Sequence, residues 1–292
     1  MLLIGSVGLR IGQTYLTTSL ELLATTAFIA VVSSAISLIL GYPVGNFLAT
    51  LGAKSRGFLG ALLVLPFLLP PFLIGITLLP LRGDDLDSNL GILLIICAHV
   101  VMNVGFVARI VASSQLPLEQ LEAARLDGAS NFLVRLRVSL PQQRAALAAA
   151  GLLIALYSAT SYGLVISLGQ GVVATLETEI AISSLMDLDL SRSFVLALLQ
   201  TLLTLTLFVF AQRAGAKPTP VFGEVPSSLP SRLGAVLALL FGLAIGLIIW
   251  NIAGRALSLN GGLFENLASL GTKGAREILN LTVLEAGANS LR

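Results

Sequence analysis

Six long apolar stretches divide this chain of 292 residues, and they constrain its fold more than any other feature. Each is close to the length of about 20 residues that an α-helix needs to cross the hydrocarbon core of a bilayer. Charged residues make up only 11% of the chain, which a soluble domain of this size does not normally show. The sequence therefore predicts an all-α, polytopic helical membrane protein with about six transmembrane helices: Leu22–Tyr42, Phe58–Leu79, Gly91–Ala108, Ala145–Leu168, Phe194–Ala211 and Leu233–Ala253.

Residues that usually build metal or catalytic sites are scarce. Cys97 is the single cysteine and His99 the single histidine, so we expect no disulfide framework and no zinc cluster. Basic residues are scattered along the chain, which argues against nucleic acid as a partner. The nearest approach to a phosphate-binding Gly-x-x-x-x-Gly-Lys-Ser/Thr motif is Gly52-Ala53-Lys54-Ser55, which lacks the glycine directly before the lysine. We expect no cofactor and no catalytic residue on this chain.

One long polar segment also has helical order: Glu119–Leu140, closed by Pro141. Pro117 precedes a first short helix at a position that tolerates proline, and Gly128 is best able to take a left-handed turn after it. Leu118 and Leu121 fall on one face of the first helix. Three leucines line one face of the second: Leu133, Leu136 and Leu140. The segment predicts a short helix, a turn and another short helix outside the bilayer.

The spacing within this segment resembles the EAA loop of ABC-importer permeases. Glu122-Ala123-Ala124, three residues, Gly128, nine residues and Val138-Ser139-Leu140-Pro141 follow its pattern, with Val138 where isoleucine is more usual. In that family the loop is a coupling helix that docks into a groove on a cytoplasmic ABC ATPase dimer. The resemblance therefore implies that a partner subunit binds ATP and contacts Glu122, Ala123, Ala124, Gly128, Phe132, Leu133, Leu140 and Pro141. The alternative is an amphipathic loop resting on lipid headgroups, with Glu122 paired to Arg125.

Three further segments resemble the thiamine and iron(III) branch of these permeases. They are Ala98–Val104, Ser167–Gly171 with Thr175 and Glu177–Ile180 after it, and Leu196–Gln200 with Ala211–Arg213. Together with the loop they are similar to the amino-terminal half of a bacterial thiamine permease over about residues 15–215. The resemblance implies a type I importer permease in the bacterial inner membrane. It also implies a periplasmic binding protein and a second permease half or copy as partners, with thiamine or ferric iron as favoured cargo.

Charge asymmetry predicts the orientation of the chain. If loop 109–144 is cytoplasmic, segments 49–57 and 212–232 are cytoplasmic too. This side then holds ten Lys/Arg and four acids, whereas the outside holds seven and eleven. The distribution agrees with the positive-inside rule and places Asp84, Asp85 and Asp187 outside.

Polar residues inside two apolar stretches are candidates for a transport pathway. His99 and Asn103 share a helix face in the third stretch, and a second group lies midway along the fourth: Tyr157, Ser158, Thr160, Ser161 and Tyr162. Polar groups at membrane depth tend to face a bundle interior or a water path, although they can equally bond neighbouring helices. Pro66, Pro70 and Pro71 break the second stretch, which fits either a kinked packing helix or a pathway-lining segment.

The chain divides by composition into a permease module at 15–215, a linker at 212–232 and a final segment at 233–292. The linker is rich in Pro, Gly and Ser. The final segment is expected to hold one more transmembrane helix and the start of a second module, because Asn289–Arg292 is similar to Thr18–Glu21 before the first stretch. The alternative is a single-module permease with a disordered tail.

Two other functions compete with an importer subunit. An intramembrane enzyme would need a nucleophile–base pair or metal ligands at membrane depth, and the sequence offers neither. An ion-coupled secondary transporter or channel would normally bury acids or unwound segments at the midplane, and only the proline-broken stretch fits.

Overall fold

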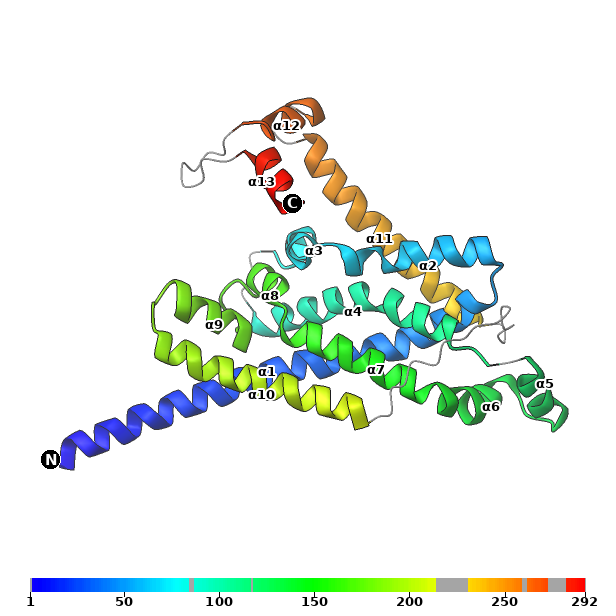
Figure 1. The fold of residues 1–292 in the computed structure, drawn as a ribbon, viewed down its shortest axis with the longest axis horizontal. Helices are drawn as coiled ribbons and strands as arrows, with labels where there is room; N and C mark the ends of the chain where they lie inside the picture. The colour runs from blue at the N-terminus through cyan, green and yellow to red at the C-terminus, as the bar shows by residue number, and fades with distance from the viewer. Residues whose placement is uncertain are drawn as a thin grey trace. The chain divides into compact units, whose positions relative to one another are not determined.

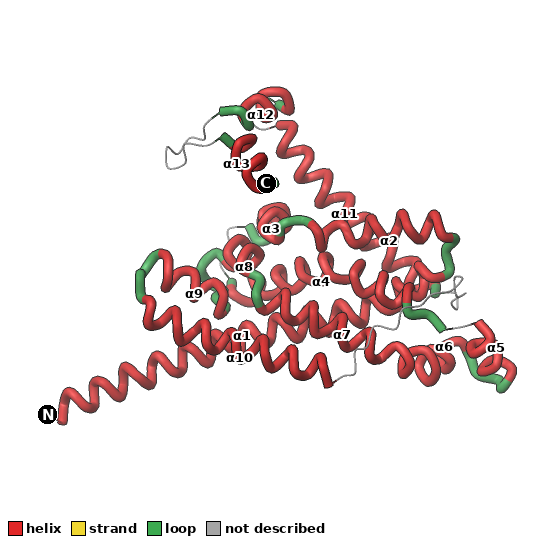
Figure 2. Tube along the Cα trace, in the orientation of Figure 1, coloured by secondary structure: helices red, strands yellow, loops and turns green. Residues whose placement is uncertain are grey.

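A computed structural model of the chain describes residues 2–83, 87–116, 118–213, 231–258, 262–272 and 282–291, and these residues form helices joined by turns (Figures 1 and 2). The helices are α1 (Leu2–Ala49), α2 (Ala53–Leu68), α3 (Pro71–Leu78), η1 (Leu79–Leu81), α4 (Ser88–Ser113), α5 (Leu118–Leu126), α6 (Asn131–Val134), η2 (Arg135–Ser139), α7 (Leu140–Ala159), α8 (Tyr162–Gly169), α9 (Leu176–Leu185), α10 (Leu190–Arg213), α11 (Arg232–Ser258), α12 (Leu263–Ser269) and α13 (Val283–Ser290).

The six predicted spans lie in these helices, so the predicted fold class is confirmed. Four helices are each long and apolar enough to cross a membrane: Thr17–Ala49, Ser88–Ser113, Leu190–Phe210 and Arg232–Arg255. Two more spans are bent pairs of helices. Ala53–Leu68 and Pro71–Leu81 meet at 88°, and Asn131–Ala159 and Tyr162–Gly169 meet at 54°.

Prolines explain the first break. Pro66 lies in the last turn of α2, and Leu69 adopts an extended conformation, with ψ of 145°, before Pro70. This is the conformation that a following proline ring favours. Pro71 then starts α3 at a position where a helix lacks N–H bonds in any case. The predicted interruption of this stretch is therefore confirmed.

The second break corrects a prediction, because Ala145–Leu168 was expected as one uninterrupted span. α7 ends at Ala159 and α8 begins at Tyr162. No proline or glycine separates them. Instead, the Thr160 hydroxyl donates to the Leu156 carbonyl at 3.1 Å, and the Tyr162 amide donates to the Thr160 carbonyl at 3.1 Å. Hydroxyl side chains that bond the backbone locally compete with the helix and can bend or end it.

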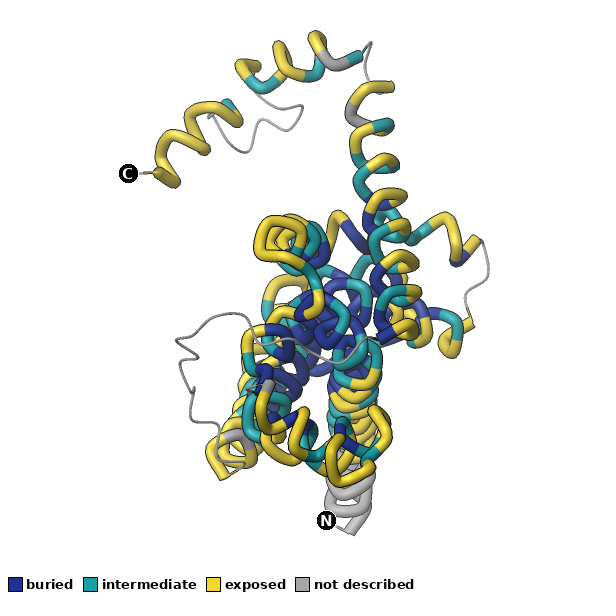
Figure 3. Tube along the Cα trace, turned by 90° about the vertical axis from the view of Figure 1, so that its right-hand side faces the viewer, coloured by how far each residue is buried: buried dark blue, intermediate teal, exposed yellow. Residues whose placement is uncertain are grey.

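α4 lies at the centre of the helical packing. Its apolar window is 61% buried, against 17% in α10 and 22% in α11, and Figure 3 shows buried residues gathered among the central helices. Gly105 of α4 lies against the Leu63 carbonyl of α2, so closely that a Cβ would overlap it. Gly41 of α1 lies against Val107, whose Cβ would be 2.5 Å from an added Cβ. Small residues let membrane helices approach closely where water supplies no driving force.

Polar side chains add bonds between these helices. The Ser34 hydroxyl of α1 donates to the Gly151 carbonyl at 2.6 Å, and the Gln143 amide donates to the Ser114 carbonyl at 2.9 Å. Gln200 of α10 donates to the Ala159 carbonyl at 3.0 Å, at the break after α7. Such bonds satisfy backbone groups that water cannot reach in a bilayer.

Arg82 is a buried arginine that links the ends of two helices. Its side chain is 2% exposed and donates to the carbonyls of Leu168 and Asp87, at the end of α8 and the start of α4. A cation at a helix C-terminus is stabilised by the helix dipole. From the sequence, Arg82 is counted only among the charges on the outer side of the membrane. In the structure it is buried and joins the end of α8 to the start of α4 through hydrogen bonds.

The chain divides into two compact units, Met1–Ile245 and Gly246–Arg292, and the boundary falls within the residues of α11. In the second unit, Thr282 and Glu285 form a capping box at the start of α13, with the Thr282 amide donating to the Glu285 carboxylate at 2.8 Å. These hydrogen bonds lower the pKa of Glu285. Most of the predicted linker, residues 214–230, and Asp84, Asp85 and Pro117 lie outside the described residues.

Candidate functional site

The polar segment folds into a helical hairpin, here called the coupling hairpin and comprising α5, the turn at 127–130 and α6. Gly128 has φ of +81°, as its predicted left-handed turn requires. The Gly128 amide donates to the Arg125 carbonyl at 2.9 Å, and the Ala129 amide to the Ala124 carbonyl at 3.2 Å. These two bonds are the Schellman pattern, which ends a helix at a left-handed glycine. The predicted helix–turn–helix is thus confirmed.

A small apolar core holds the hairpin together. Leu121 of α5 and Val134 of α6 are buried against each other and against Leu116, with Val138 packed beside them. Val134 and Val138 therefore form the buried face of the second helix. The three leucines that the sequence places on one face of this helix differ in exposure: Leu133 and Leu140 are half-buried and Leu136 is 48% exposed. Leu136 and Leu140 line a pocket together with residues of α1.

Much of the coupling hairpin is open to a partner. Glu122, Ala123 and Gly128 are exposed, and Phe132 is 70% exposed. Arg125 donates to the Asn131 side chain at 3.1 and 2.8 Å, across the turn, rather than to Glu122 as the alternative interpretation expected. Leu126 is 89% exposed and was missed from sequence. The sequence did offer a signal, because Leu126 is an apolar residue four positions after Glu122 and directly before the predicted turn.

The second hairpin helix runs directly into the membrane span. Pro141 was expected to close the segment, but Asn131–Ala159 is one continuous helix through α6, η2 and α7. Proline cannot donate a backbone bond and crowds the carbonyl four residues earlier. The helix widens just before it into the π-turn η2, in which the Leu140 amide donates to the Arg135 carbonyl. This wider turn accommodates Pro141 without ending the helix.

The other end of this helix borders a cavity of about 480 Å³. Six of the seven residues predicted to face a pathway line it: His99, Asn103, Tyr157, Thr160, Ser161 and Tyr162. The seventh, Ser158, is 3% exposed and does not line the cavity, because it lies on a different face of the last turn of α7. Phe67, Pro71, Met102 and Gly163 complete the lining.

Both broken spans reach this cavity. Pro71 starts α3, while Thr160 to Gly163 cover the break between α7 and α8. The two breaks are packed together: a Cβ on Gly163 would lie 3.0 Å from the Phe72 amide nitrogen. Phe67 at the end of α2 contacts the Tyr157 ring edge to face at 5.6 Å between centroids. The two interrupted spans thus bring helix ends to one cavity, which polar side chains line in part.

The polar groups of the cavity are incompletely bonded within the described part of the chain. Asn103 donates to the His99 carbonyl at 2.7 Å, a bond within its own helix. Both ring nitrogens of His99 and the Ser161 hydroxyl have no partner among the described residues. Buried polar groups normally have partners, so an ordered water molecule is expected beside these atoms.

The segment between α8 and α10, which is predicted to lie outside the membrane, contains the short helix α9. α9 begins with a capping box at Thr175 and carries Glu177 and Glu179 in its first turn. Glu179 forms an ion pair with Arg192 at the start of α10, whereas partial burial raises the pKa of Glu177. Glu179 is therefore engaged internally, and Asp187 is an exposed acid on this side.

No curated protein sequence matches the chain significantly. Among solved structures, the chain is similar to a chain of a bacterial ABC transporter involved in the import of the acidic polysaccharide alginate. The identity is 14% and the TM-score 0.48, over 70% of this chain and 84% of that one. The family model for the binding-protein-dependent transport system inner membrane component matches residues 38–217. This range covers more than half of the chain and includes the coupling hairpin and the cavity, and the protein therefore belongs to the family of binding-protein-dependent transport system inner membrane components.

Proposed function

We propose that this chain is the membrane-spanning permease subunit of an ATP-driven ABC importer. It forms part of the path for a small solute that a periplasmic binding protein delivers, and a separate ATPase dimer drives it. The observation that carries the proposal is the single helix Asn131–Ala159, which begins in the exposed coupling hairpin and ends at the polar cavity. Movement of the hairpin therefore reaches the cavity through one rigid element.

The coupling hairpin suits a docking role. A groove on a partner needs a compact insert with small residues for close approach, and Ala123 and Gly128 are both exposed here. Glu122 supplies a charge for polar contacts, and Phe132 and Leu126 supply apolar surface. Large exposed apolar groups outside a membrane span favour a protein partner. Nucleotide chemistry belongs to that partner, and this chain has a transport role rather than an enzymatic one.

The cavity suits passage of an organic solute. Its lining offers two tyrosine rings, a phenylalanine, an imidazole, an amide and hydroxyls, and no Asp, Glu, Lys or Arg is among the described residues that line it. Aromatic faces attract organic cations such as the thiazolium ring of thiamine. Bare ferric iron would be expected to prefer anionic oxygen ligands, by the preference of hard cations for oxygen. Of the two cargoes that the sequence resemblance favours, thiamine fits this lining better.

An ion-coupled transporter is the second candidate, because broken helices at membrane depth are also typical of that class. The neutral lining of the cavity and the exposed coupling hairpin favour ATP coupling instead. Uptake into vesicles distinguishes the two. An importer subunit requires the ATPase and ATP, whereas an ion-coupled transporter works from an ion gradient alone.

Glu122→Arg is expected to abolish co-purification of the chain with its ATPase. The substitution reverses a charge at an exposed position of α5 without disturbing the hairpin core. A candidate ABC ATPase would be co-expressed with the chain, and its recovery on a tag on the permease would be measured. Glu265→Arg makes the same charge change at an exposed residue of α12 and should leave recovery unchanged. Full recovery with Glu122→Arg would contradict the docking role.

Cysteine labelling is expected to place the coupling hairpin in the cytoplasm. In a Cys97→Ser background, a cysteine at exposed Asp187 should react with a membrane-impermeant thiol reagent added outside the cytoplasmic membrane. A cysteine at exposed Arg137 should react only after the membrane is opened. Labelling in the reverse order would overturn the orientation that the positive-inside rule predicts.

A further inference from the structure

A second pocket, here called the interface pocket, lies between α1, the start of the helix Asn131–Ala159 and the start of α11, and encloses about 320 Å³. It is separate from the cavity described above, and no residue lines both. Its lining combines five aliphatic or proline side chains with two rings and three polar groups: Ile39, Pro43, Leu136, Leu140, Leu233, Tyr42, Phe132, Asn46, Arg135 and Ser231.

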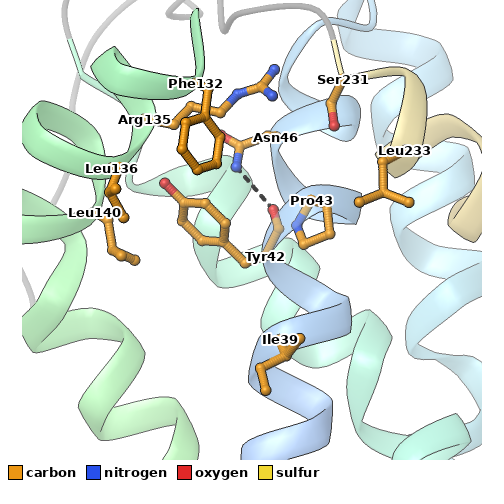
Figure 4. A pocket seen from close by; sticks show the side chains of 10 residues that line it. All are labelled: Ile39, Tyr42, Pro43, Asn46, Phe132, Arg135, Leu136, Leu140, Ser231 and Leu233. Carbon is orange, nitrogen blue, oxygen red and sulfur yellow. Dashed lines mark hydrogen bonds between the residues drawn. The ribbon is translucent and has the colours of Figure 1, made fainter.

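The lining is divided by polarity. Figure 4 shows the side chains of Arg135, Asn46 and Ser231 toward one end and Ile39 at the other, with Leu140 and Leu233 on opposite sides. Arg135 is the only charged residue among the described residues that line the pocket. The Tyr42 hydroxyl is buried in the lining of the pocket. A ligand with a negative charge at one end and hydrocarbon at the other matches this arrangement, in which the Phe132 ring also lies beside Arg135 (Figure 4).

The pocket lies where three spans begin or end. Tyr42 and Asn46 are in the last turns of the span Thr17–Ala49, and Leu233 is in the first turn of Arg232–Arg255. Leu136 precedes Pro141 at the start of the third. Ile39 and Leu233 are 68% and 62% exposed, so in a bilayer they face acyl chains. Charged side chains at this level meet lipid headgroups, and basic pockets between helices on the cytoplasmic side bind anionic ones.

We propose that the interface pocket binds one anionic phospholipid of the membrane. The phosphate lies by Arg135, with Ser231 and Tyr42 as hydroxyl donors, and one acyl chain leaves past Ile39 and Leu233. The volume holds a phosphate and the first part of a chain, and the exposed aliphatic residues carry the rest. The lipid thus lies between α1 and the start of the helix Asn131–Ala159, next to the coupling hairpin.

The test uses the full chain in nanodiscs of equimolar phosphatidylcholine and phosphatidylglycerol. The lipids that stay bound when the protein is released are counted by native mass spectrometry. We expect phosphatidylglycerol to be enriched over phosphatidylcholine, and Arg135→Gln to reduce this enrichment about fivefold, by the loss of one headgroup charge contact. Arg137→Gln removes a neighbouring charge that does not line the pocket and should keep the enrichment. Equal enrichment in the two variants would overturn the proposal.

Two further arms keep the test decisive. Leu136→Trp fills the apolar side without changing charge, and it should expel the lipid even if Arg135→Gln fails to fold. Free glycerol 1-phosphate, added in excess, distinguishes a phosphate site from a lipid site. Displacement of phosphatidylglycerol by this soluble headgroup alone would overturn the lipid assignment, as would equal retention of phosphatidylcholine and phosphatidylglycerol by the unmodified chain.

Discussion

Replacing Gly128 by valine is expected to stop ATP-driven uptake while the protein still inserts into the membrane. Gly128 has φ of +81°, and nothing lies within 4 Å of a Cβ built there. A side chain therefore meets no clash, and the whole effect comes from backbone strain. Such strain costs about 1–3 kcal/mol, which lowers the population of the turn by about 5- to 150-fold. A β-branched residue in the left-handed region lies toward the upper end.

The matched variant is Gly128→Asn, because asparagine enters the left-handed region more readily than other side chains. It adds a side chain in the same open space and should keep most of the uptake. Both variants would be compared in proteoliposomes with the ATPase and binding protein, measuring uptake and ATP hydrolysis together. If valine and asparagine transported equally well, the left-handed turn would have no part in coupling.

Thr160→Trp is expected to block uptake to background. Thr160 lies at the break between α7 and α8 and lines the cavity of about 480 Å³. An indole ring there fills space that a solute needs. The substitution also removes the hydroxyl that bonds the Leu156 carbonyl at the break. The φ of −100° at this position is open to any residue, so the block is expected to come mainly from the added volume, with little change in ATPase co-purification.

The control for this variant is Thr206→Trp. Thr206 is an exposed residue of α10, and its hydroxyl bonds the Leu202 carbonyl just as that of Thr160 bonds Leu156. The same substitution away from the cavity should leave uptake of labelled thiamine, or of whichever cargo the unmodified complex carries, close to normal. Unimpaired uptake with Thr160→Trp would remove the cavity from the path.

The fold could be predicted from sequence because hydrophobic length and proline position decide it locally. A run such as Gly91–Ala108 has few stable states other than a membrane helix. Pro70 and Pro71 together break the second stretch, although single prolines, Pro43 and Pro141, lie within continuous helices. By contrast, the break at Thr160 depends on hydroxyls that bond the backbone, and the same residues elsewhere sit in unbroken helices. Thr206 in α10 is one example.

The cavity could be predicted in part. Polar residues such as His99 and Thr160 stand out in apolar stretches, and the structure brings them together. Whether they serve a path stays a prediction. The phase of the second hairpin helix could not be predicted, because Leu136 and Val134 are both apolar and only the positions of α5 and α1 decide which faces inward. Arg82 was missed for a related reason: its acceptors are backbone carbonyls, which leave no mark in the sequence.

The unbroken helix Asn131–Ala159 has a mechanical consequence. At a rise of 1.5 Å per residue it is about 40 Å long, so a small change in its tilt moves one end far relative to the other. A tilt of about 10° pivoting at the cavity sweeps the hairpin end through roughly 7 Å, by the same geometry. On the proposed function, a movement of roughly 7 Å that a partner subunit imposes on the hairpin would correspond to only a small rotation at the cavity.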